Sequence, residues 1–101
     1  MNYNEVICLY LKKYLTDEQF KEYFYYHLDE FENDLDEDIY LEMISTNFNS
    51  REQKFDLREY LQEYIFDNCK ETYENINDAY IERYIQSDNR GIIREILKSS
   101  F

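Results

Sequence analysis

The residues best suited to chemistry lie in one acidic run. Between Glu22 and Ser50 the chain has nine carboxylates and no lysine or arginine, and tyrosines and phenylalanines are interspersed among them. The whole chain carries 23 acidic and 11 basic residues, whereas the part outside this run has 14 acidic and 11 basic residues. Such a local excess of charge destabilises a small domain by self-repulsion. It therefore indicates a function, and the function it favours is binding of a strongly basic partner.

Catalysis and metal binding find little support in the sequence. The single histidine, His27, falls on a predicted apolar helix face, and there is no glycine-rich phosphate loop or nucleophile elbow. The segment Asp34–Asp38 imitates the start of a calcium loop, but Ile39 stands where the loop requires glycine and Ser45 where it requires glutamate. We expect no enzyme activity, no cofactor and no metal site beyond weak, non-specific binding of divalent cations.

The charge and the hydropathy also restrict the partners and the compartment. The acidic run excludes direct nucleic-acid binding, and the small basic group Arg90, Arg94 and Lys98 fits a solvated helix end. No basic-then-apolar leader and no apolar run of membrane-spanning length is present, so we expect a cytoplasmic protein. Cys8 and Cys69 could form a structural pair, but two free thiols in apolar surroundings are the expectation.

The elements that position the acidic run are predicted to be helices. The chain has no proline and one glycine, and its 44% hydrophobic and 19% aromatic content can form a core. We expect a single all-α domain over residues 1–101, folded as a compact bundle of four to six helices. The predicted helices are 4–15, 17–33, a third one after Asp36, 56–86 and 91–99; the fourth is either one long helix or two with a kink near Asn68.

Local signals support several of these boundaries. Thr16 and Gln19 have the spacing of a capping box, and Asp36 can cap the third helix. The third helix is expected to present Ile39, Tyr40, Met43, Ile44 and Phe48 as its apolar face. Two start signals compete before the fourth helix, at Ser50 and at Asp56, and the second is favoured because Phe55 then occupies a staple position.

A helical wheel divides the second predicted helix into two faces. Its apolar face holds Phe20, Phe24, His27, Leu28, Phe31 and Leu35, and its opposite face holds acids and tyrosine. With the aspartate-rich turn that follows, this opposite face is the predicted partner-binding site. We call it the acidic face, and it comprises Glu18, Glu22, Tyr25, Tyr26, Asp29, Glu32, Asp34, Asp36, Glu37 and Asp38.

Two short segments resemble a known family. Tyr14-Leu15-Thr16-Asp17-Glu18-Gln19-Phe20 is similar to the entry to the first helix of the small acidic helical immunity proteins that neutralise bacterial toxins, especially those of nuclease colicins. Gly91-Ile92-Ile93-Arg94-Glu95-Ile96 resembles the opening of their last helix, and immunity proteins of contact-dependent inhibition systems fit equally well. The resemblance implies a bacterial, one-to-one inhibitor of a cognate toxin domain that blocks the active site or an adjacent exosite.

Three functions remain open from the sequence. The leading hypothesis is an immunity or antitoxin protein whose acidic face occludes a basic toxin domain, with a nuclease as the expected toxin. The second is a phage or mobile-element DNA mimic in which carboxylates replace phosphates. The third is a helical interaction or regulatory module, monomeric or weakly dimeric through Tyr73, Tyr80 and Tyr84.

Overall fold

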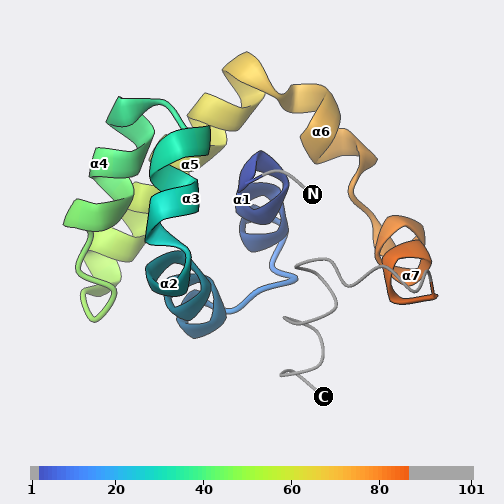
Figure 1. Cartoon of the computed structure of the whole chain (residues 1–101), viewed down its shortest axis with the longest axis horizontal. Coiled ribbons are helices and arrows are strands. Elements are labelled where there is room, and N and C mark those ends of the chain that lie inside the picture. The colour runs from blue at the N-terminus through green and yellow to red at the C-terminus, as the bar shows by residue number, and fades with distance from the viewer. Residues whose placement is uncertain (1–2, 87–101) are drawn as a thin grey trace.

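The computed structural model describes residues 3–86, and helices are the only regular elements in that range (Figure 1). This confirms the all-α prediction. The part described contains seven helices, more than the expected four to six, because both of the long predicted helices are divided. They are α1 (Tyr3–Leu11), α2 (Asp17–Tyr26), α3 (Leu28–Asp34), α4 (Glu37–Ser45), α5 (Arg51–Asn68), α6 (Lys70–Asn75) and α7 (Asp78–Gln86). The predicted helix 91–99 lies outside the described residues.

Helix α1 forms the centre of the fold. Figure 1 places it between the group formed by α2, α3 and α4 on one side and α7 on the other. Five consecutive residues, Val6 to Tyr10, are at most 1% exposed. A helix that is apolar on all sides is typical of a fully enclosed position, so α1 is the element around which the others pack. It ends at Leu11 rather than at the predicted Leu15, and Lys13 has a positive φ of 66° in the turn that follows.

The predicted helix 17–33 is wrong in its continuity, because the chain turns at His27. In a straight helix Phe24 and Phe31, which are seven positions apart, would be separated by about 10 Å along the axis. The turn instead brings their rings into an edge-to-face contact with centroids 5.2 Å apart. Tyr23, which the wheel did not assign to the core, is buried and stacks on His27 at 4.3 Å. Aromatic packing therefore accounts for a break that no glycine or proline marks.

The start of α5 differs from the favoured prediction. Ser50 is the N-cap, and its hydroxyl accepts a hydrogen bond from the Gln53 amide at 3.2 Å. Asp56 is therefore an interior position of the helix, and Phe55 is 60% exposed rather than a buried staple. Of the two alternatives for the predicted helix 56–86, the structure shows the broken one, since α5 ends at Asn68. A second break at Ile76, which the sequence did not reveal, separates α6 from α7.

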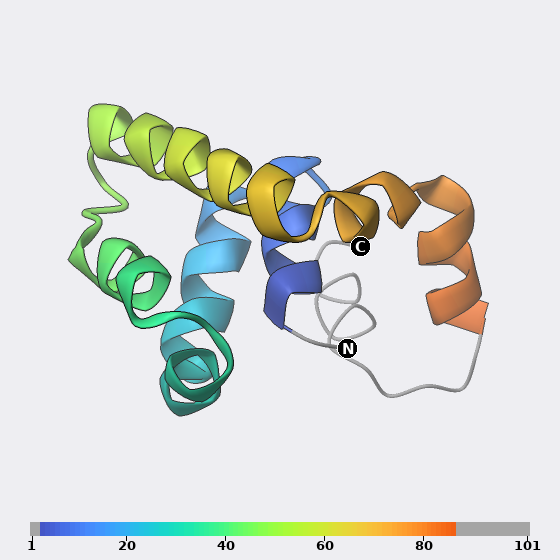
Figure 2. The ribbon, with the colours of Figure 1, turned by 90° about the horizontal axis from the view of Figure 1, so that it is seen from above.

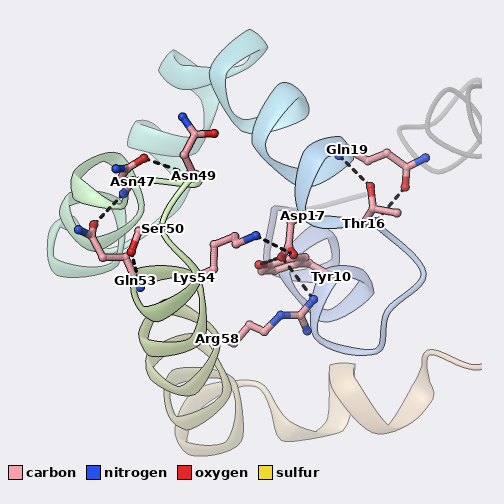
Figure 3. A network of polar contacts seen from close by, with 10 residues as sticks. All are labelled: Tyr10, Thr16, Asp17, Gln19, Asn47, Asn49, Ser50, Gln53, Lys54 and Arg58. Atoms are coloured by element: carbon pink, nitrogen blue, oxygen red, sulfur yellow. Dashed lines mark hydrogen bonds and ion pairs between the residues drawn. The ribbon is translucent and has the colours of Figure 1, made fainter.

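Asp17 is the main polar junction of the fold (Figure 3). The Tyr10 hydroxyl donates to its Oδ1 at 2.5 Å, and Arg58 and Lys54 form ion pairs with it at 3.5 and 3.7 Å. The Arg58 guanidinium also lies 4.3 Å from the centroid of the Tyr10 ring. Thr16 caps α2 directly before Asp17, in the predicted capping box. Asp17 thus joins α1, α2 and α5.

Polar contacts also hold α6 and α7 against α1 and the turn after it. The Tyr14 hydroxyl donates to Asp78 at 2.6 Å, and the Tyr80 hydroxyl donates to Glu5 at 2.5 Å. Lys12 donates to the carbonyl of Ile76 at 2.5 Å. Figure 2 shows α5, α6 and α7 following one another from one end of the molecule to the other. Within residues 3–86, no helix combines the length and apolar character required to cross a membrane.

Candidate partner-binding face

All ten residues of the acidic face are exposed to solvent. Tyr26 is the extreme case, because 84% of its surface is accessible, whereas Tyr25 is 43% exposed. The Tyr25 ring packs against the rings of Phe24 and Phe48, with centroids 5.4 and 6.5 Å apart. Tyr26 touches His27 edge-on at 4.9 Å. One tyrosine is thus partly packed while the other projects almost entirely into solvent, beside the carboxylates.

The geometry of the face differs from the single stripe on one helix that the wheel predicted. Helix α2 is seen nearly end-on in Figure 1 and from the side in Figure 2, and the reverse holds for α3. The turn at His27 therefore gives the two halves of the face different directions. Glu18, Glu22, Tyr25 and Tyr26 lie on α2, Asp29, Glu32 and Asp34 lie on α3, and Asp36, Glu37 and Asp38 form the start of α4.

The structure brings part of α3 together with α4. Tyr40, on α4, is next to Glu32 and Asp29, and its pKa is raised by partial burial and by these two carboxylates. Burial also raises the pKa of Tyr3 near the other side of α3, with further contributions from Glu30 and Asp34. The carboxylates of α3 thus surround the helix instead of forming one line.

The aspartates that follow α3 approach α5 instead. The pKa of Tyr60, on α5, is raised by burial and then by the charges of Asp38 and Glu42. Asp36 acts in the same direction on Tyr64 and Cys69, after burial. Asp36 occupies the predicted N-cap position of α4, but its side chain makes no capping hydrogen bond. The acidic face therefore extends around the edge of the molecule from α2 to the side of α5.

Little positive charge neutralises this surface. Among the described residues, Glu18 of the acidic face forms an ion pair with Lys21 at 3.8 Å; the Glu18 side chain is exposed and that of Lys21 is partly exposed. Such an exposed pair contributes little to stability. His27 is half-buried and lies 3.5 Å from Glu30, in keeping with a packed histidine near a carboxylate. Between residues 3 and 86, no group of three or more potential ligands is arranged to hold a metal ion.

One residue assigned to an apolar helix face is exposed, and the suggested dimer contacts are placed only in part. Ile44, assigned to the apolar face of its helix, is 38% exposed, although Ile39, Met43 and Phe48 are buried as predicted. Tyr73 and Tyr80, the suggested dimer contacts, pack partly buried against the core, and the side chain of Tyr84 lies outside the described part.

The cysteines behave as expected, because both are free thiols. The junction at Asp17 was missed entirely. Its only sequence signal is a first-turn acid beside a capping threonine, and that signal does not identify Lys54 and Arg58 as its partners.

Comparison with known proteins gives no assignment. The chain matches no protein-family model, no curated protein and no solved structure at the level of significance required.

Proposed function

We propose that this chain is an immunity protein that binds and neutralises a basic toxin domain, for which a nuclease is the best candidate. The observation that supports the proposal most is the exposed, unmixed charge of the acidic face around Tyr26, which is 84% exposed. Exposing a large aromatic ring on a like-charged surface has no benefit for folding. Both features become favourable when a basic protein covers them.

The proposed mechanism is occlusion, and the chain itself supplies no chemical step. The carboxylates steer a basic partner to the face and accelerate association, in a manner that salt screens. Tyr26 then serves as an anchor, because tyrosine buries a large rigid ring while its hydroxyl keeps a hydrogen bond. Tyr25, held by Phe24 and Phe48, needs little further ordering. The pair therefore slows dissociation, and the bound toxin loses access to its negatively charged substrate.

The experiment is a co-expression assay with each candidate toxin domain from the reading frames next to this chain's gene. The wild-type chain is expected to restore growth, and the double variant Glu22→Lys, Asp29→Lys is expected not to. The matched control is Glu71→Lys, Glu82→Lys, which changes the net charge equally at exposed positions on α6 and α7. Protection by the control and loss of protection by the test variant support the proposal. Equal protection by both variants would remove the acidic face from the mechanism.

An unrelated DNA-binding nuclease in the same assay distinguishes this function from DNA mimicry. An immunity protein recognises a particular surface, so we expect no protection against the unrelated enzyme. Protection against both enzymes would favour a mimic that competes with DNA on many binders.

A further inference from the structure

Helix α4 carries an apolar ridge on its outward side. Leu41 and Ile44 are 48% and 38% exposed. They are three positions apart in the sequence, hence about one turn of the helix apart. At 100° per residue they point away from Ile39 and Met43, which are buried in the core. A solvated helix normally carries polar side chains at such positions. We call Leu41 and Ile44 the α4 ridge.

Acidic groups border this ridge on both sides. Tyr40 flanks it in the direction of α3, where its neighbours are Glu32 and Asp29. On the other side Asp38 and Glu42 face Tyr60 of α5. The ridge also falls within the run from 22 to 50, which has no lysine or arginine. Its surroundings are thus negative on two sides, although the ridge itself is apolar.

We infer that the α4 ridge docks a basic amphipathic helix, with apolar residues of that helix against Leu41 and Ile44 and its lysines or arginines against the flanking carboxylates. Charge complementarity favours a basic partner, because an acidic one would place like charges opposite each other and an uncharged one would leave the carboxylates without opposite charges. The spacing of the ridge suits a helix, since residues three apart form a row that packs into the groove of a second helix. Recognition of amphipathic helices commonly uses anchors at such spacing.

A second copy of this chain does not fit the ridge. Two copies would bring together the acidic borders of both ridges, in a protein whose formal net charge is −12. Like charges in juxtaposition across an interface oppose association. The inference rests on the proposed function for the expectation that the natural partner is basic. Beyond the proposed function, it states that the same partner makes two contacts. One of its surfaces covers α2 and α3, and one of its helices packs on α4.

The test uses a synthetic probe and needs no toxin, so its failure is distinct from failure of the proposed function. The probe is a fluorescent peptide of leucine and lysine, about 18 residues long, with leucines on one helical face. A scrambled peptide of the same composition measures attraction by charge alone. By fluorescence anisotropy the patterned peptide is expected to bind at least about tenfold more tightly, a difference of about 1.4 kcal/mol.

The chain offers matched variants for this measurement. Leu41→Gln, Ile44→Gln removes the ridge at exposed positions with a good helix former, and is expected to lower affinity for the patterned peptide about tenfold. Phe55→Gln is the control, because Phe55 is also exposed but lies on α5, where its neighbours Glu52 and Asp56 are accompanied by the positive charge of Arg51, and it is expected to leave binding unchanged. Circular dichroism verifies that each variant is folded.

Two kinds of result would overturn the inference. The first is a lack of specificity for the ridge, seen either as equal binding of the patterned and scrambled peptides or as a loss of affinity in the Phe55 control equal to that in the ridge variant. The second is a concentration-dependent dimer of the free chain in sedimentation that the ridge substitutions abolish, since this would assign the ridge to a second copy.

Discussion

The hydroxyl of Tyr10 donates a hydrogen bond of 2.5 Å to Asp17, and thereby connects the buried helix α1 to the first turn of α2. Burial disfavours a charged carboxylate at this position. The bond from Tyr10 and the positive charges of Arg58 and Lys54 outweigh that effect, and the pKa of Asp17 is lowered. The negative charge of Asp17, which lies before the acidic run in the sequence, is therefore compensated within the fold by Arg58 and Lys54. The acids of the run are exposed instead.

Removing the charge of Asp17 should destabilise the protein. The variant Asp17→Asn loses a charge-assisted hydrogen bond and two partly exposed ion pairs. We expect the free energy of unfolding to fall by about 1–2 kcal/mol in urea titrations. Glu18→Gln is the control, because it changes an exposed acid in the same helical turn. Its effect should stay within about 0.5 kcal/mol. Equal stability of Asp17→Asn and wild type would contradict the role of this junction.

The same residue predicts a dependence of stability on pH. Because the folded pKa of Asp17 is lowered, its contribution is complete above the unfolded value of about 3.9 and is lost as the pH falls through the folded pKa. We expect the difference in stability between wild type and Asp17→Asn to be constant from pH 5 to 7, as an order-of-magnitude window, and to shrink below about pH 4. A difference that grows on acidification would show that the charged form is not the stabilising one.

The exposed carboxylates of the acidic face should lower the stability of the folded protein by mutual repulsion. Replacing Glu22 with Gln and Asp29 with Asn removes two charges from the acidic face without changing side-chain size. We expect a melting temperature equal to or above that of wild type at low salt, with the difference diminishing as salt increases. Calorimetry at low and high ionic strength makes the comparison. A clear loss of stability in the double variant would indicate that these carboxylates serve folding instead of binding.

The two thiols should be unreactive in the folded protein. Burial, with the nearby Cys69, raises the pKa of Cys8 to about 12, and burial together with Asp36 raises the pKa of Cys69. Since the thiolate is the reactive form, both should react with a disulfide reagent at pH 8 much more slowly than in urea. Cys69, which is less buried, should react first. Equally fast reaction of both thiols without denaturant would contradict the burial of α1.

Local signals in the sequence predict some boundaries well and others poorly. The capping box at Thr16 and Gln19 forms as predicted because it involves side chains three residues apart. The turn at His27 depends on Phe24 meeting Phe31, which is a tertiary contact that helical periodicity does not encode. The choice between Ser50 and Asp56 was wrong for a related reason. Both have capping spacing, and the ion pairs of Lys54 and Arg58 with Asp17 favour a helix that already includes position 54.

The exposure of the candidate face was easier to predict than its shape. Every one of its ten residues is exposed, as the helical wheel predicts for the side opposite the apolar face and as charged side chains generally are. Its division among α2, α3 and α4 follows from the turn at His27 and was missed with it. Leu41 and Ile44 were not identified as a surface ridge, because Ile44 was grouped with the neighbouring core residue Met43 and Leu41 was not assigned to either side.

Binding of a basic toxin domain by the acidic face can be measured by titration calorimetry of the purified pair at several salt concentrations. The prediction is tight one-to-one binding that weakens as salt increases. Glu22→Lys, Asp29→Lys should bind at least about a hundredfold more weakly, a loss of about 2.7 kcal/mol, and with a shallower salt dependence. The contradicting result is that this variant and Glu71→Lys, Glu82→Lys both bind with unchanged affinity and unchanged salt dependence. The acidic face would then not be the surface that binds the toxin.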